Sequence, residues 1–559
     1  MKKKDIYMVL GCFAILIGFM LTKHYVLAAS LSKDYQGPVL MIKEEENMTT
    51  YENYDEVVKR QDENVYIDLD TISNHLKILT DYDANNGVLV ITSTDKIIRF
   101  YQDGKVKMNQ NIVENIPPMK KMDEKIFIPI NKIAENLRIK YTFVEENGSI
   151  ILENQMDKKI IAKAVKNNVN VRFEATSWSH EDDFLQEDEA VEVLKEEGEW
   201  VKVLTPRGKT GYVQKKELKD QQEVLGLADK NKPVWKPESG KIILTWEHVF
   251  SKNPEISKIG ALEGVNVISP TWITLTDASG TIKNKISNEY IYWAKSRGYK
   301  IWPLFTNDFN PDMTNEFFQN AGTREKVIND LAKLVKENNM DGINIDFENV
   351  YLKDKERLVI FVRELTSVFH ENNLVVSIDV TVRGGSENWS QCYDRGALGE
   401  VVDYIALMAY DEHWGSSPVS GSVASMGWVE KGIKGLLEEV PSEKLILGVP
   451  FYTRIWMETP TNEDPNKMNV KSKAVKMEAV NEILEKDGIE KVWDEESGQN
   501  YVEYVENNIL HKIWIEDEKS MQLRADFVSK YDLAGIATWR RGFETEDIWT
   551  VIEERLTKK

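Results

Sequence analysis

This chain has few cysteines, and its basic residues are fewer than its acidic ones. Its 559 residues include two cysteines, Cys12 and Cys392, which give no disulfide framework, so each domain must be stabilised by its own core. Acidic residues number 92 against 71 basic ones, a formal charge of −21. That balance excludes the basic surface of a nucleic-acid-binding protein. At 42% hydrophobic and 29% charged residues, the chain is long enough for several folded domains.

Long apolar runs are missing except at the N-terminus. An uncharged segment from Ile6 to Leu21 follows the basic cluster at Lys2 to Lys4. This pattern predicts a signal peptide or an uncleaved signal anchor over residues 1–29, and both alternatives stay open. Either one implies export to the extracellular side or the cell envelope, with membrane contact only through this segment.

An internal repeat comes next. "VYIDLDTISNHLKI" from Val65 recurs as "IFIPINKIAENLRI" from Ile126, an offset of 61 residues. Each copy predicts a strand, a helix and a hairpin around Gly87 or Gly148. Residues 38–155 resemble the copper amine oxidase N-terminal-like domains of bacterial surface proteins. Because the segment has one histidine, a metal site is disfavoured and a spacer or adhesion module is preferred.

A small β-rich unit is predicted over residues 160–220. Short alternating strands are separated by turns at Gly198 and Gly208, which favours a small β-barrel. "NVNVR", "GEWVKV" and "GKTGYV" resemble the bacterial SH3-like domain. The resemblance implies binding of cell-wall peptides, and a packing module between neighbouring domains is the equal alternative.

Residues 240–559 show a third pattern, in which apolar strands alternate with amphipathic helices. Eight strands over roughly 300 residues predict an α/β fold, a (β/α)₈ TIM barrel. The longest interval, before the last strand, predicts a β-rich insertion with a hairpin through "QNYVEYVENNILHKIWIED". The eight segments are "KIILTW" at 241, "VNVISP" at 265, "KIWPLFT" at 300, "GINIDF" at 342, "VVSIDV" at 375, "YIALMAY" at 404, "KLILGVPF" at 444 and "GIATWR" at 535.

The fourth of these strands carries acidic side chains in an alternating pattern. In "DGINIDFENV", period-two geometry sends Asn344, Asp346 and Glu348 to the barrel axis and the intervening apolar residues to the helices. Catalytic residues of such barrels lie at the C-terminal ends of strands. Burial of one carboxylate beside another raises at least one pKa and so creates a general acid. A calcium site is disfavoured because the spacing of a calcium-binding loop is absent.

Four motifs in order resemble glycoside hydrolase family 18, the chitinase and N-acetylglucosaminidase family. They are "DGINIDFE", "MAYD" from Met408 to Asp411, "GVPFYTRIW" after the seventh strand, and Trp539 at the end of the eighth. "GINIDFE", "PLFTND" and "WRRGFE" are most similar to the spore-germination and cortex-lytic branch. Asn344 stands where the family's first inner aspartate usually lies, and "FTNDFN" replaces its Ser-x-Gly-Gly segment.

The resemblance implies a substrate-assisted retaining mechanism, without metal or cofactor. Glu348 is the expected acid, Asp346 and Tyr410 hold the acetamide group, Asp411 grips the distorted sugar, and Trp539 stacks beneath it. Met408 and Asn344 complete the expected substrate-binding set. Weaker candidates for residues that line the mouth of the barrel are Trp246, Trp302, Trp414, Trp456, Arg541 and Glu544.

The expected activity is cleavage of β-1,4 linkages next to N-acetylglucosamine in a polysaccharide, either peptidoglycan or chitin. A non-catalytic chitinase-like lectin of the cell envelope is the alternative, although a lectin has no need of the acid Glu348. Peptidoglycan, spore cortex and chitin all remain open as substrates, as do exo and endo cleavage.

Overall fold

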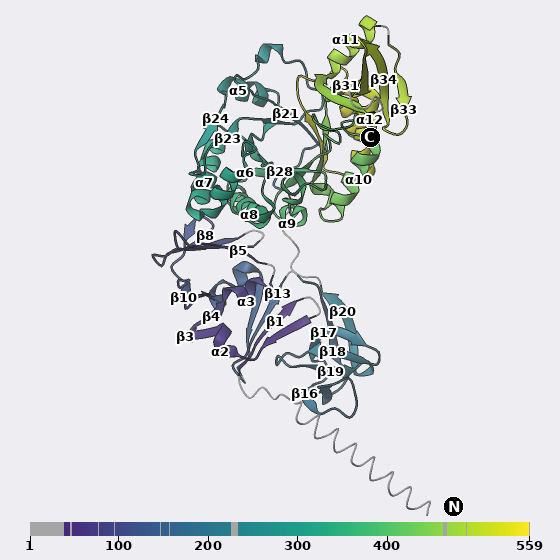
Figure 1. Ribbon diagram of the computed structural model, residues 1–559. Helices are drawn as coiled ribbons and strands as arrows, with labels where there is room; N and C mark the ends of the chain where they lie inside the picture. The colour runs from purple at the N-terminus through teal and green to yellow at the C-terminus, as the bar shows by residue number, and fades with distance from the viewer. Residues whose placement is uncertain are drawn as a thin grey trace, which may run out of the picture. The chain divides into compact units, whose positions relative to one another are not determined.

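The computed structural model describes residues 38–557, except 45–46, 77, 94–95, 146, 156, 225–232, 462–466 and 488 (Figure 1). The predicted signal segment, residues 1–29, lies outside this range. Within the described part of the chain, no helix is long and apolar enough to cross a membrane. The chain forms two compact units, one comprising 1–78, 104–106 and 113–230 and the other 79–103, 107–112 and 231–559.

The first unit contains most of the internal repeat. Its two sheets have the orders β12-β13-β1-β2 and β10-β11-β4-β3. Each copy forms the predicted strand, short helix and hairpin, and the strands β4 and β11 of the two copies pair with each other. The elements are β1 (Leu40–Glu44), β2 (Asn47–Tyr51), α2 (Tyr54–Val57), β3 (Val58–Gln61), β4 (Asn64–Asp68), α3 (Leu69–Ser73), β10 (Lys120–Met122), β11 (Lys125–Pro129), α4 (Ile130–Ile133), β12 (Ile139–Phe143) and β13 (Ile150–Asn154).

The SH3 region of the first unit is a seven-stranded sheet of order β16-β15-β19-β18-β17-β14-β20. Alternate residues of its strands, among them Val171, Val203 and Val213, fill a small apolar core. The strands are β14 (Lys159–Ala164), β15 (Val169–Arg172), β16 (Glu181–Leu185), β17 (Ala190–Glu197), β18 (Trp200–Leu204), β19 (Thr210–Gln214) and β20 (Leu218–Val224).

The second unit is built on the predicted barrel. β21 pairs in parallel with both β22 and β36, which closes the ring of eight strand positions. The second position is divided between β22 and β23, and the third between β25 and β26. The strands are β21 (Ile242–Glu247), β22 (Val267–Pro270), β23 (Ile273–Leu275), β25 (Lys300–Ile301), β26 (Leu304–Thr306), β27 (Gly342–Asp346), β28 (Val375–Thr381), β29 (Tyr404–Met408), β30 (Leu445–Pro450) and β36 (Gly535–Trp539).

Two apolar layers flank these strands. Outward residues such as Ile345 and Ile378 pack against the helices, whereas inward residues such as Leu244 and Ala406 form a separate inner cluster. Trp235, from the segment before the barrel, packs against that inner cluster. The helices are α5 (Asn288–Ser296), α6 (Pro311–Gln319), α7 (Ala321–Glu337), α8 (Lys355–Glu371), α9 (Arg395–Gly399), α10 (Met426–Leu437), α12 (Glu518–Lys530) and α13 (Ile548–Leu556).

The predicted insertion between the seventh and eighth strands is a five-stranded sheet of order β32-β31-β35-β34-β33 (Figure 1). Its β34 and β35 form the expected hairpin, with Val502 opposite Ile513. The elements are β31 (Tyr452–Pro460), β32 (Met468–Lys476), α11 (Met477–Asp487), β33 (Val492–Asp494), β34 (Gln499–Glu506) and β35 (Ile509–Ile515).

A segment of the internal repeat packs on the barrel. Strands β5 (Leu79–Asp83), β6 (Val88–Thr92) and β7 (Ile97–Phe100) place Val88, Val90 and Ile97 against residues of α7 and α8. Beside this apolar contact, Glu364 of α8 accepts from Arg99 at 2.8 Å and from Arg324 of α7 at 2.7 Å. The hairpin of the first repeat copy therefore packs as part of the second unit.

Candidate active site

The fourth barrel strand presents its polar side chains as the alternation predicts. Ile343 and Ile345 pack in the outer layer of the barrel, and Phe347 joins them just after the strand. Asn344 and Asp346 are buried on the opposite, axial side. This arrangement follows from period-two geometry in a strand with helices on one face and an enclosed barrel on the other.

Asn344 is fixed by the neighbouring fifth strand. Its amide nitrogen donates to Oδ2 of Asp379 at 2.6 Å, and its oxygen accepts from the Ser377 hydroxyl at 2.7 Å. The side chain is 1% exposed. Because both ends of its amide are used by protein groups, Asn344 contacts the rest of the site through Asp379.

Glu348 follows directly after the fourth strand and is held by its backbone. The buried Asn307 accepts from the Glu348 N–H at 3.1 Å and donates to the Glu348 carbonyl at 2.9 Å. The same amide nitrogen also donates to the Thr314 hydroxyl of α6. The preceding carbonyl, that of Phe347, accepts from the buried Tyr393 hydroxyl at 2.9 Å. These bonds fix the position of the Glu348 backbone.

The carboxyl groups of the site have strongly perturbed acidities. Burial raises the pKa of Asp346 to about 7. Burial, and then the charges of Asp346 and Asp411, raise the pKa of Glu348 well above its usual value. Desolvation disfavours the charged form of a carboxyl, and a like charge nearby adds to this effect. The site therefore favours the protonated form of Glu348, the form that a general acid requires.

The sixth strand supplies Met408, Tyr410 and Asp411. Met408 ends β29 on the same inward alternation as Ala406 and is buried. The pKa of Tyr410 is raised by burial first and then by the charges of Asp379 and other groups of the site, including Asp346 and Glu348. The Tyr410 hydroxyl therefore belongs to the same cluster as the carboxyls.

Asp411 is oriented by the insertion. Its Oδ1 accepts from the Tyr452 hydroxyl at 2.6 Å, and Arg454 lies 3.7 Å from the same oxygen. Tyr452 and Arg454 both belong to β31, in the "GVPFYTRIW" motif. The Asp411 side chain remains 46% exposed, so it is available to a ligand.

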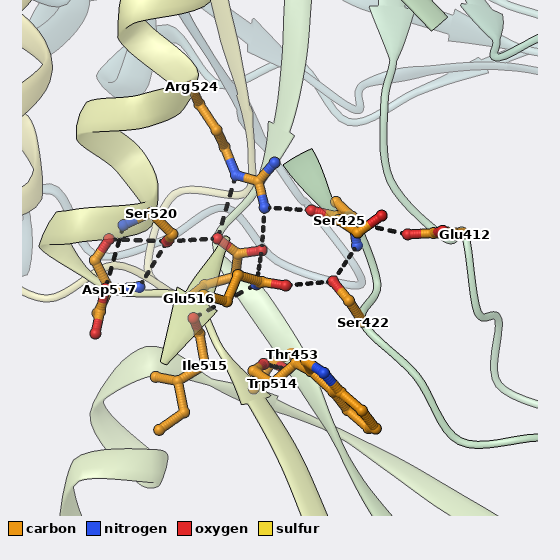
Figure 2. A network of polar contacts seen from close by, with 12 residues as sticks. Glu412, Ser422, Ser425, Thr453, Trp514, Ile515, Glu516, Asp517, Ser520 and Arg524 are labelled. Atoms are coloured by element: carbon orange, nitrogen blue, oxygen red, sulfur yellow. Dashed lines mark hydrogen bonds and ion pairs between the residues drawn. The ribbon is translucent and has the colours of Figure 1, made fainter. Parts of the chain in front are cut away.

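The loop that follows Asp411 is anchored by a buried polar network (Figure 2). Arg524 of α12 forms an ion pair with Glu516 and donates to the Ala424 carbonyl at 2.7 Å. Gln499 of β34 donates to Glu516 at 2.8 Å and accepts from Ser422. Since Arg524 and Glu516 are fully buried, this network ties the loop, the insertion and α12 into one rigid arrangement.

Trp539 ends the eighth strand on the inward alternation that also contains Ala537. It is half-buried and makes edge contacts with Trp246 and His248, with ring centroids 6.0 Å apart in both pairs. Its peptide bond to Arg540 is cis. One part of the ring is therefore supported by the barrel while another part remains accessible.

The weaker candidates for the barrel mouth lie in several different surroundings. Arg541 pairs with the buried Glu247, which also accepts from the Tyr290 hydroxyl at 3.0 Å, so this arginine is used structurally. Glu544 accepts from the backbone of its own turn. Trp246, Trp302 and Trp456 are buried, whereas Trp414 is 53% exposed.

Three residues of the site were not identified from the sequence. Asp379 alternates with Ser377 in "VVSIDV", the same signal that marks the fourth strand. Asn307 lies in "FTNDFN", and its role depends on a contact with a distant segment. Tyr452 is part of the "GVPFYTRIW" motif, but the sequence does not reveal its contact with Asp411.

Among the described residues, no group of three His, Cys, Asp or Glu side chains is placed to hold a metal ion.

Comparison with known proteins identifies two domain families in this chain. Residues 314–544 match the family Glycosyl hydrolases family 18, and residues 167–219 match the Bacterial SH3 domain. The chain is 24% identical over 294 residues to the uncharacterized glycosylase YvbX of Bacillus subtilis (strain 168), covering 50% of this chain and 81% of that protein. It is 22% identical over 259 residues to the cortical fragment-lytic enzyme of the same organism, covering 46% of this chain and 59% of that protein.

Solved structures share the barrel fold. The spore cortex-lytic enzyme SleL of Bacillus megaterium QM B1551 matches with a TM-score of 0.51 at 20% identity, over 60% of this chain and 76% of that one. A chitinase from Chromobacterium violaceum ATCC 12472 also matches with a TM-score of 0.51 at 20% identity, over 57% and 100% of the two chains. The chain therefore contains a glycosyl hydrolases family 18 domain, which makes it a glycosidase, and a bacterial SH3 domain.

Proposed function

We propose that the barrel cleaves β-1,4 linkages next to N-acetylglucosamine by a substrate-assisted, retaining mechanism. In this mechanism the 2-acetamido group of the sugar attacks its own anomeric carbon, so the protein supplies an acid and an acetamide clamp rather than a nucleophile. The observation that carries the proposal is the position of Glu348 beside Asp346. A buried carboxyl that keeps its proton near neutral pH is required for protonating a leaving group.

The other residues have distinct roles in this proposal. Glu348 protonates the glycosidic oxygen and later activates water. Asp346 accepts from the acetamide N–H and stabilises the positive charge that develops on the ring formed by that group. Tyr410 donates to the acetamide oxygen, Asp411 binds a sugar hydroxyl, and Trp539 stacks under the sugar ring. Support comes from the shared electrostatic environment of Tyr410 and the two acids, and from the partial exposure of Asp411 and Trp539.

The substrate we propose is peptidoglycan, including spore cortex, ahead of chitin. Two observations support this order: one similar protein is named a cortical fragment-lytic enzyme, and the chain carries an SH3 domain in addition to its barrel. In the proposal the SH3 domain binds cell-wall peptides. The N-terminal apolar segment directs the protein to the cytoplasmic membrane for export, and the protein acts on the outer side of that membrane.

Replacement of Glu348 by Gln tests the proposal. The amide keeps the size of the side chain but has no acidic proton, so hydrolysis should fall by about a hundredfold to ten-thousandfold. Reducing ends and product masses are measured on defined muropeptides and on chitin oligomers, which identify both the substrate and the cleaved bond. Glu356→Gln, on the exposed face of α8, is the matched control and should retain activity.

Two results would contradict the proposal. Equal turnover by the wild-type protein and Glu348→Gln would remove the assigned acid. Binding of the oligomers without any cleavage by the wild-type protein would instead identify a sugar-binding protein on a hydrolase fold.

A further inference from the structure

The barrel interior holds a third buried acid, Asp379, beside the fourth strand. In the parallel pairing of β27 with β28, Asn344 lies opposite Ser377 and Ile345 lies opposite Ile378. The next inward position on each strand is Asp346 and Asp379, so these two acids occupy the same level of the barrel on adjacent strands. Asp379 is 1% exposed.

Each carboxyl of this pair has one buried oxygen without a hydrogen-bond partner among the described residues. Oδ2 of Asp379 accepts from the Asn344 amide at 2.6 Å. Oδ1 of Asp379 and Oδ1 of Asp346 are both buried, and neither has a hydrogen-bond partner among the described residues. Two buried carboxylates side by side are strongly unfavourable, whereas a carboxylic acid next to a carboxylate shares a proton.

The groups that face Asp379 favour retention of that proton. Asp346 and Glu348 come from the fourth strand, Tyr410 from the sixth, and the Trp246 indole from the first. Burial and then the charge of Asp346 raise the pKa of Asp379 well above its usual value, although the Asn344 amide and the Trp246 indole both act in the opposite direction. The charged groups in this set are all carboxyls, so a proton on one of them relieves repulsion for the others.

We propose that Asp379 is a positioning residue for Asp346: a neutral carboxylic acid whose Oδ1–H donates to Oδ1 of Asp346 and so holds that group as the carboxylate that receives the substrate acetamide. The proposal rests on the role given to Asp346 under the proposed function. The proton stays within the pair, on Asp379 while Asp346 accepts from the acetamide, and no other reactant is needed.

This arrangement also explains why an amide is suitable at position 344. The Asn344 amide donates to Oδ2 of Asp379, which leaves Oδ1 for the proton that is directed at Asp346. Ser377 fixes the orientation of the Asn344 amide by donating to its oxygen. An aspartate at position 344 would instead place a second acceptor against Oδ2 of Asp379.

Two substitutions of Asp379 test whether its side chain acts as a neutral hydrogen-bond donor or as a negative charge. Asp379→Asn keeps an N–H that can donate to Asp346, so the acid limb of the kcat/KM profile should stay within about 0.3 pH unit of wild type. Asp379→Val removes the donor without opening space for water, so this limb should move to higher pH by about one unit, because the Asp346 carboxylate loses its hydrogen bond. Glu356→Gln, which removes an exposed carboxyl of α8, is the control and should leave the limb in place.

The direction of the shift decides between the alternatives. If both substitutions move the acid limb to lower pH, Asp379 is ionised and acts by repulsion, which overturns the proposal. If neither moves the limb, Asp379 has only a structural role, and the proposal is again wrong.

Infrared difference spectroscopy tests the proton without any turnover. In a Glu348→Gln background, which removes the neighbouring acid with a raised pKa, the carbonyl band of a neutral carboxylic acid at Asp379 should be present at about pH 8, where Asp346 is ionised. Asp379→Asn should remove this band, and its persistence or its absence from the parent would overturn the proposal. If wild type and Glu348→Gln show equal turnover, the proposed function fails, whereas this band still determines whether Asp379 carries the proton.

Discussion

Replacement of Asp346 by Asn should stabilise the barrel at alkaline pH. Burial raises the pKa of Asp346 from 3.8 to about 7, so the folded state binds a proton that the unfolded state releases. Stability therefore falls as pH rises between these two values, by about 1.4 kcal/mol per pH unit. Over the full interval the wild-type carboxyl costs about 4 kcal/mol, an upper limit because its ionisation is linked to Asp379 and Glu348.

The assay is denaturant unfolding of the wild type and Asp346→Asn at a series of pH values. The variant should gain up to about 4 kcal/mol near pH 8, and the difference should shrink towards zero near pH 4, where the carboxyl is protonated in both states. Asp330→Asn, an exposed position on α7, is the control and should show no such dependence. A stability difference that is independent of pH, or one that grows as pH falls, would refute the electrostatic reasoning.

Three further predictions follow from contacts around the site. Asn307→Ala should lower kcat with little change in KM, because Glu348 loses both backbone bonds that orient it; single-turnover kinetics check this, and an unchanged chemical step would refute it. Arg524→Met should destabilise the barrel by about 3–5 kcal/mol, because Glu516 is left buried without its partner; chemical denaturation measures this, and a loss under 1 kcal/mol would contradict it. A fragment of residues 240–559 should be less stable than a fragment that also contains the strands β5 to β7, because removal of these strands uncovers Glu364 and the apolar face of α7 and α8. Thermal unfolding of the two fragments measures the difference. Equal midpoints would show that the hairpin is dispensable.

Much of the fold could be predicted because it depends on local periodicity. The eight barrel strands, the insertion hairpin and the elements of the repeat each follow from apolar spacing and turn residues within a short window. The polar alternation at Asn344, Asp346 and Glu348 could be assigned to the barrel axis for the same reason. The copper amine oxidase resemblance of residues 38–155 remains a prediction.

The contacts that the sequence did not reveal are all between distant segments. The hairpin of β5 and β6 has the same local pattern as its repeat partner, yet its apolar face packs on α7 and α8 rather than within the repeat. Arg541 lies in a motif expected at the mouth, but the carboxylate it binds, that of Glu247, belongs to the first strand. Local patterns indicate which face of an element is apolar, while the partner of that face depends on the packing of the whole unit.

The sequence by itself determined the strand and helix order and the inward row of Asn344, Asp346 and Glu348, because each follows from residue spacing along one segment. Only the tertiary structure decided what surrounds these side chains. Asp379 reaches Asn344 through the register between two strands 35 residues apart, and Asn307 reaches the Glu348 backbone across 41 residues. The acidity of a buried carboxyl depends on these neighbours, and they are brought together only when the barrel closes.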